Sequence, residues 1–230
     1  MAAAILVAYC ALRTWSHFRA VSLTNADLTK FLPPPPVPRR LKEGCPELHS
    51  AIDAANNNSE LGFRTLGQDH VAVYKAVLVD AMTRGWRRLN ISVTTTPLSD
   101  RDFRNCECFD HINLENLSAA FHTSHRLINA ILPTKQMKLV DEDDQSSLVR
   151  TNDPGKTIGE GKAIKDAVDI AFDTGLFSMS EIAFDKDHRH AVVSYSFWCG
   201  LLCGNGATLI FENVGGEWKR SAHDCGSWIS

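Results

Sequence analysis

Phe-Trp-Cys-Gly-Leu-Leu-Cys-Gly-Asn-Gly, residues 197–206, predicts a glycine-rich bend between two strands in the last quarter of the chain. Before the bend, residues 193–197 alternate between large apolar and small polar side chains, the period of two that is typical of a strand. After it, residues 207–211 resume an apolar side chain at every second position. The glycine pair at 215–216 predicts a tight reversal into a further strand. We therefore expect an antiparallel β-meander over residues 180–230.

The chain before this meander predicts helices and short strands. Apolar residues recur at helical spacing over 69–85, 114–133 and 164–175. Strands are predicted over 90–96 and 137–140, with 147–150 as a candidate partner of the second strand. Helices that precede a run of antiparallel strands imply an α+β fold, in which the helices pack on one face of an antiparallel β-meander sheet.

The sequence divides into three parts. Residues 1–20 form an apolar anchor or signal-like segment, residues 21–68 a proline-rich linker and irregular region, and residues 69–230 a single α+β domain. The uncharged run at 2–12 is shorter than the about 20 residues that span a bilayer, and no Lys or Arg precedes it. It is interpreted as a signal or anchor whose true start is missing, a membrane-surface helix, or a short helix packed on the domain.

The composition is that of a globular protein with a nearly balanced charge. Hydrophobic residues make up 44% of the chain, charged residues make up 22%, and the formal net charge is −3. This balance lacks the strong basic excess of most nucleic-acid-binding proteins, so no nucleic-acid partner is predicted. The prolines at 33–36 predict a stiff, extended spacer. The alternative is that they are a ligand for an SH3-type partner. The sequence names no partner, although the N-terminal segment suggests a membrane tether.

Seven cysteines suggest an oxidised, exported protein. One of them, Cys10, lies in the N-terminal apolar run and leaves six as disulfide candidates. These six are Cys45, Cys106, Cys108, Cys199, Cys203 and Cys225. A bridge across the glycine-rich bend is geometrically plausible, with Cys225 as an alternative partner. The alternative is a reduced cytosolic protein whose cysteines are buried thiols.

Two weaker patterns involve metal-ligating residue types. The first set is Cys199, Cys203, His223 and Cys225. Its ligand types suit zinc, but its spacing is not that of a standard zinc site. The second pattern is His122 and His125, which would be neighbours on the surface of the helix predicted over 114–133, with Asp110 and His111 nearby in sequence. They are interpreted as a surface histidine and a core-edge histidine, so no metal, cofactor or catalytic residue is predicted.

Three aromatic residues in the meander, Tyr195, Phe197 and Trp218, are candidates to line a small-ligand pocket between the helices and the curved sheet. The alternative is that they are plain core residues. Asp185-Lys-Asp187 lacks the remaining ligands of a calcium loop and predicts the turn of a hairpin instead.

The C-terminal residues also carry a family resemblance. Ser180-Glu-Ile-Ala-Phe-Asp-Lys-Asp, Ala191-Val-Val-Ser-Tyr-Ser, Cys199-Gly-Leu-Leu-Cys-Gly-Asn-Gly and Gly216-Glu-Trp-Lys occur in this order. The pattern resembles a group of uncharacterised bacterial proteins that are secreted or envelope-associated. The resemblance is specific over 180–230 and suggestive over 69–150. It implies a domain type and transfers no catalytic residue.

From these patterns we expect an exported or envelope-tethered domain with a binding or structural role. Its location would be periplasmic or secreted, and attachment through a membrane anchor is a further option. One alternative is a cysteine- or metal-dependent hydrolytic enzyme that uses the cysteine-glycine bend or the predicted histidine helix. A second alternative is a small-ligand-binding pocket domain.

Overall fold

A computed structural model describes residues 63–64, 66–99, 102, 112 and 117–230. The first elements are β1 (Phe63–Arg64), α4 (Gln68–Thr83), β2 (Leu89–Ser92), α5 (Leu117–His122), β3 (Ser124–His125), the short 3-10 helix η3 (Asn129–Ile131) and β4 (Met137–Val140). The helices α6 (Glu142–Thr151), α7 (Pro154–Gly159) and α8 (Ile164–Thr174) follow. The remaining elements are β5 (Leu176–Met179), β6 (Ala183–Phe184), β7 (His190–Gly200), β8 (Cys203–Val214) and β9 (Glu217–Ile229).

A seven-stranded sheet is the centre of the fold. Its strand order is β4-β2-β5-β7-β8-β9. The short strand β6 lies off this path and pairs with the beginning of β7, at Ala191 and Val192. All pairings among the strands β5 to β9 are antiparallel, as the meander predicts. The predicted hairpin turn at 185–187 lies between β6 and β7.

The sheet is mixed, which corrects the prediction of a purely antiparallel meander. The short strand β2 lies between β4 and β5 and runs parallel to both. Parallel neighbours need a long crossover connection. The chain leaves β4 through the three helices α6, α7 and α8 and returns to the sheet as β5, on the other side of β2. The α+β class itself is confirmed.

Two further predictions were wrong in their secondary structure. Residues 147–150, expected to be a strand, belong to α6, because Asp141 caps this helix by accepting hydrogen bonds from the backbone N–H groups of Asp143 and Asp144. The helix expected over 114–133 is a short α5 followed by β3 and η3. In that stretch a backbone bridge between Thr94 and Arg126 draws the chain into extended conformation.

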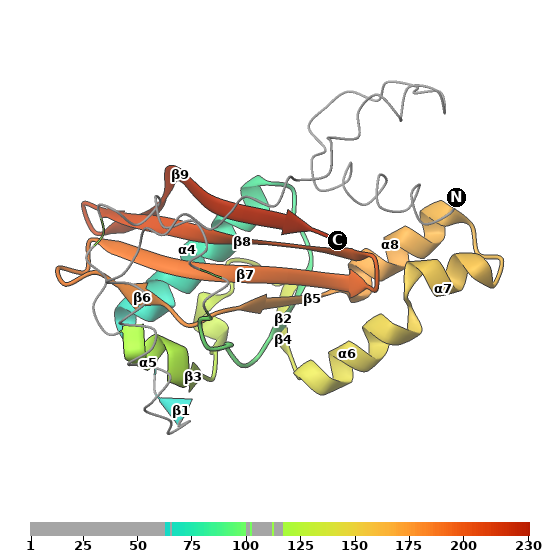
Figure 1. The fold of residues 1–230 in the computed structure, drawn as a ribbon, viewed down its shortest axis with the longest axis horizontal. Coiled ribbons are helices and arrows are strands. Elements are labelled where there is room, and N and C mark those ends of the chain that lie inside the picture. The colour runs from blue at the N-terminus through green and yellow to red at the C-terminus, as the bar shows by residue number, and fades with distance from the viewer. Residues whose placement is uncertain (1–62, 65, 100–101, 103–111, 113–116) are drawn as a thin grey trace, which may run out of the picture.

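The main core lies between α4 and one face of the sheet. Its helical side consists of Val73, Tyr74, Val77, Leu78 and Ala81. Its sheet side includes Val193, Phe197, Leu209 and Phe211. Figure 1 shows α4 across one face of β7, β8 and β9, whereas α6, α7 and α8 lie at the end of the sheet where β7 turns toward β8. The alternation at 193–197 therefore separates a core face from an opposite face, on which Ser194 bonds Thr208.

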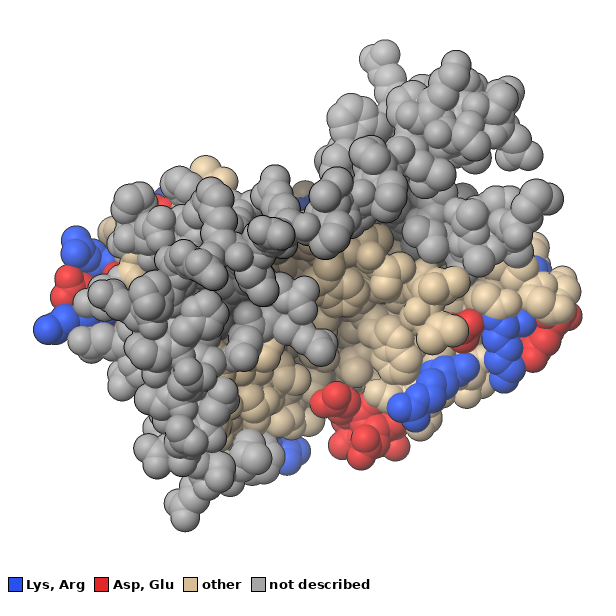
Figure 2. Space-filling view, in the orientation of Figure 1, with Lys and Arg blue, Asp and Glu red and all other residues tan. Residues whose placement is uncertain are grey.

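The charged surface is mixed in sign on the face shown in Figure 2. Lys and Arg side chains alternate with Asp and Glu around the end formed by α6, α7 and α8, and much of the described surface between them is uncharged. None of the helices in the described part of the chain combines the length and apolarity needed to span a bilayer.

Candidate functional site

The glycine-rich bend is closed by a disulfide between Cys199 and Cys203. Their Cα atoms are 5.0 Å apart, and both residues are buried. Among the other candidate cysteines, Cys225 is buried in β9, whereas Cys45, Cys106 and Cys108 lie outside the described residues. The structure thus joins one predicted pair in a bridge. The side chain of His223 is also outside the described part of the chain.

The bridge holds an exposed apolar tip. Leu201 is 82% exposed and Leu202 is 40% exposed. The tip is attached to the start of α7, because the Leu201 N–H donates a hydrogen bond of 2.6 Å to the Asp153 carboxylate. Gly200 has a φ of +146°, and a side chain there would meet Asp153 and Pro154. The bend therefore has a fixed conformation in which two leucines face outward.

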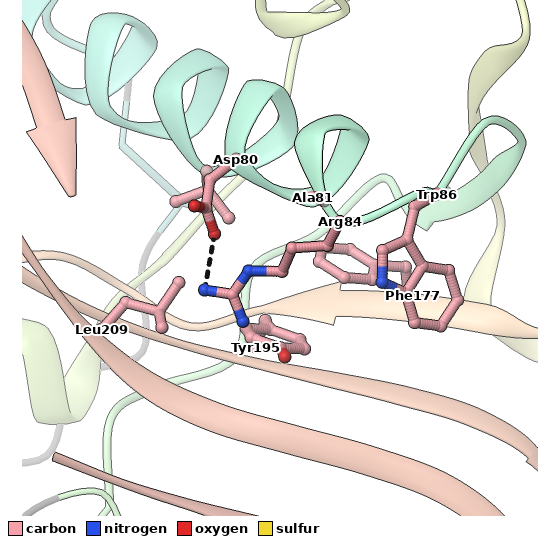
Figure 3. Close-up of a pocket in the computed structure, with 8 residues that line it drawn as sticks. Asp80, Ala81, Arg84, Trp86, Phe177, Tyr195 and Leu209 are labelled. Atoms are coloured by element: carbon pink, nitrogen blue, oxygen red, sulfur yellow. Dashed lines mark ion pairs between the residues drawn. The ribbon is translucent and has the colours of Figure 1, made fainter. Parts of the chain in front are cut away.

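A small pocket lies between α4 and the sheet (Figure 3). Its lining residues are Val77, Asp80, Ala81, Arg84, Trp86, Phe177, Tyr195 and Leu209. The Arg84 guanidinium crosses the pocket toward the sheet and pairs with Asp80 at 2.9 Å. Arg220 approaches the same carboxylate at 3.4 Å. The cavity volume of about 10 Å³ is at the lower limit for holding one water molecule.

The three aromatic pocket candidates have different surroundings. Tyr195 lines the pocket and stacks on Phe177, with ring centres 5.3 Å apart. Phe197 packs against Trp86 in the core. Trp218 contacts Phe184 with ring centres 5.8 Å apart. Only Tyr195 therefore faces this pocket, and ligand binding by these aromatics stays a prediction.

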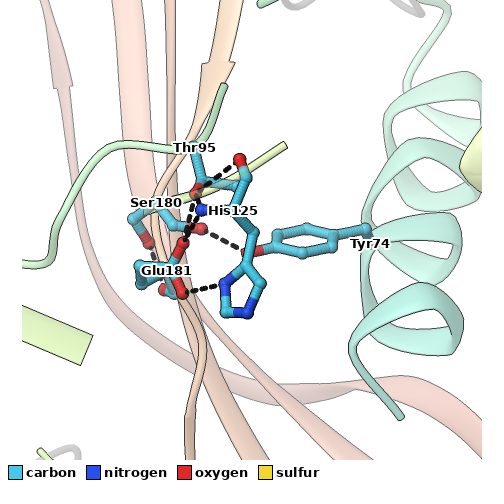
Figure 4. Close-up of polar contacts among 5 residues, drawn as sticks. All are labelled: Tyr74, Thr95, His125, Ser180 and Glu181. Atoms are coloured by element: carbon cyan, nitrogen blue, oxygen red, sulfur yellow. Dashed lines mark hydrogen bonds and ion pairs between the residues drawn. The ribbon is translucent and has the colours of Figure 1, made fainter. Parts of the chain in front are cut away.

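A buried polar cluster joins three segments that are distant in sequence (Figure 4). Glu181, which is 2% exposed, accepts a hydrogen bond from the hydroxyl of Thr95 and another of 2.9 Å from the backbone N–H of His125. The Nδ1 atom of His125 lies 2.7 Å from the second oxygen of the same carboxylate. Because a carboxylate oxygen accepts at this position, Nδ1 of His125 carries a proton.

Backbone pairing holds the cluster in place. The Glu181 N–H donates to the Thr96 carbonyl at 2.7 Å, and the Thr95 N–H donates to the His125 carbonyl at 3.0 Å. Tyr74, from α4, donates its hydroxyl to the Ser180 carbonyl at 3.0 Å. Burial, together with the Glu181 charge, raises the pKa of Tyr74 well above its usual value. The phenol therefore remains a neutral hydrogen-bond donor.

His70 adds a second imidazole beside this cluster. It lies one turn before Tyr74 on α4, and its ring centre is 5.1 Å from that of His125. Burial, reinforced by His125, lowers the pKa of His70 to about 4, against a smaller opposing effect of Asp69. Asp69 itself pairs with Nδ1 of His188 at 2.8 Å. His70 is therefore a neutral imidazole near pH 7.

The predicted pairing of His122 with His125 on one helix is wrong. α5 ends at His122, and His125 belongs to β3. The partner that His125 has in the fold, Glu181, is 56 residues further along the chain. The only sequence signal for a role of Glu181 is that a carboxylate occurs in a stretch that otherwise predicts buried strands. Within the described ranges, no three His, Cys, Asp or Glu side chains are spaced to enclose a metal ion.

No protein-family model, curated protein or solved structure matches this chain. The resemblance to secreted or envelope-associated bacterial proteins stays a prediction.

Proposed function

We propose that this chain is an exported or envelope-tethered domain with a binding or structural role. The observation that carries the proposal is the disulfide between Cys199 and Cys203. Disulfides of this kind persist in oxidising compartments and are rare in the cytosol, where thiols are kept reduced. The N-terminal apolar run and the proline spacer add the sequence features of a tether.

The position of the bridge supports a binding or structural role. Both sulfur atoms are buried, whereas Leu201 between them is exposed to solvent. A catalytic dithiol needs a solvent-accessible sulfur of lowered pKa. A bridge that fixes a bend and presents two leucines is suited to recognition or to stabilising the fold.

Thiol counting after denaturation tests the redox part of this proposal. Protein taken from its native host without reductant should be alkylated at neither Cys199 nor Cys203, and both should react after reduction. Peptide mass spectrometry distinguishes the two states. Full alkylation of both cysteines in freshly lysed, unreduced cells would contradict the proposal.

Export is tested separately with a fusion. Residues 1–68 are joined to a reporter enzyme that is active only after export, and the matched control lacks residues 2–12. We expect reporter activity from the fusion and none from the control. Equal activity of both fusions, or inactivity of both, would contradict export through this segment.

A further inference from the structure

The rings of His70 and His125 form a pair with an arrangement that neither the disulfide nor the proposed export explains. They come from α4 and β3, and their centres are 5.1 Å apart with a tilt of 44°. Two imidazoles that share one tetrahedral ion, with metal–nitrogen distances of about 2.0–2.1 Å, have ring centres roughly 5 Å apart. The separation in this protein is compatible with a shared ion.

His125 is oriented in the way that metal-ligating histidines usually are. Its Nδ1–H donates to Glu181, and Figure 4 shows the second ring nitrogen on the edge turned away from this carboxylate. A carboxylate at this position fixes the tautomer and makes the other nitrogen a better ligand. Thr95 holds the carboxylate in turn by donating its hydroxyl to it.

The ligand nitrogens have no other partner in the described part of the chain. Nε2 of His125 and both ring nitrogens of His70 make no hydrogen bond there. The His125 side chain is 7% exposed, and His70 is only half-buried. Within the described residues, these nitrogens are therefore not engaged by another side chain.

We propose that His70 and His125 bind a divalent transition-metal ion of the zinc class, each through one ring nitrogen, with water at the remaining positions. Neutral imidazole is a preferred ligand of zinc, copper and nickel, whereas magnesium and calcium prefer oxygen. Glu181 supplies a negative charge behind His125, and Asp69 supplies a second one beside His70. The two-nitrogen site is open, so it exchanges its ion and leaves positions for an external ligand.

The test uses the untagged full chain with its disulfide intact and zinc chloride as the probe. Calorimetric titration measures the binding, and nitrogen-15 histidine spectra identify the ligating nitrogens. We expect zinc to shift the Nε2 resonance of His125 while its Nδ1 stays protonated, and to shift one ring nitrogen of His70. Unchanged resonances at either ring in the presence of excess zinc would overturn the proposal.

Variants separate this site from other histidines and cysteines of the chain. His70→Phe, on a half-buried helix surface, should abolish one zinc equivalent, and Glu181→Gln should weaken it about 10- to 100-fold. His190→Ala is the matched control, since His190 also pairs through Nδ1 with a carboxylate, that of Asp185. It has no neighbouring imidazole ring among the described residues. Zinc binding that survives His70→Phe, or that His190→Ala removes, would overturn the assignment.

Discussion

Asp153 and Leu201 are 48 residues apart in sequence, yet the Leu201 N–H donates to an Asp153 carboxylate oxygen at 2.6 Å. The other carboxylate oxygen accepts from the Lys156 N–H at 2.9 Å and so caps α7. One side chain therefore satisfies a helix terminus and the exposed end of the disulfide-closed bend. This contact couples the α6–α8 crossover to the β7–β8 hairpin.

Asp153→Ala should remove both hydrogen bonds and lower the free energy of unfolding by about 1–3 kcal/mol. Chemical denaturation measures this loss. The hydrogen exchange of the Leu201 amide should also become faster, because that N–H loses its acceptor.

Asp141→Ala is the control, because Asp141 caps α6 and makes no hydrogen bond to the bend. It should cost about 1 kcal/mol and leave the exchange of the Leu201 amide unchanged. Equal Leu201 exchange in the two variants would show that Asp153 does not hold the bend.

Local patterns in the sequence were sufficient for the elements whose structure depends on near neighbours. The helix predicted from 69 to 85 is α4, which ends where Gly85 adopts a φ of +95°. The alternation at 193–197 and the glycine pair at 215–216 gave β7, β8 and the following reversal. In each case side-chain periodicity or a positive φ is a property of a few consecutive residues.

Long-range pairing could not be predicted in the same way. The parallel register of β2 between β4 and β5 depends on a helical crossover and leaves no signal in the four residues of β2. The His125–Glu181 pair likewise joins residues 56 apart, each unremarkable in its own segment. The sequence suggested His122 as the neighbour of His125 only because helical spacing was assumed for both residues.

Gly206→Ala should destabilise the sheet by about 1–3 kcal/mol through steric overlap. A Cβ at this position would lie 2.5 Å from the Tyr195 carbonyl oxygen and 2.5 Å from the Trp228 ring nitrogen. Gly159→Ala is the matched control, because no atom lies within 4 Å of the corresponding Cβ. Thermal and denaturant unfolding should rank the control near the wild type. Equal stability of the two variants would contradict this packing of Trp228 on β8.

The disulfide should stabilise the fold only modestly. It closes a loop between residues four apart. The loop-entropy model gives about 2 kcal/mol for a loop of this size. The Cys199→Ala/Cys203→Ala double variant should lose about this much free energy of unfolding in denaturant. Reductant should have little further effect on its stability, because the variant lacks this bridge. Reductant should destabilise the wild type by a similar amount, and a wild type that is insensitive to reductant after verified cleavage of this bridge would contradict the prediction.

Asp185 should make the stability depend on pH in the acid range. Its buried carboxylate accepts hydrogen bonds from the Arg189 N–H at 2.6 Å, the His190 N–H at 2.9 Å and the His190 ring at 2.7 Å. Burial acts to raise the pKa of Asp185, but these bonds outweigh it and lower the pKa below the usual value of an aspartate. The stabilisation is therefore complete above the unfolded-state pKa and is lost as pH falls through the lower folded-state pKa.

Asp185→Asn should lower the free energy of unfolding near pH 7 by roughly 1–3 kcal/mol, because an amide is a weaker acceptor than a carboxylate. Below the folded-state pKa of Asp185 the wild type also lacks the charge, so the difference between the two proteins should shrink there. Asp187→Asn is the control, since Asp187 pairs with Arg189 on an exposed surface and should change stability little. Denaturant unfolding at a series of pH values measures all three proteins. A difference between Asp185→Asn and the wild type that stays constant down to the most acidic pH would contradict a lowered pKa at Asp185.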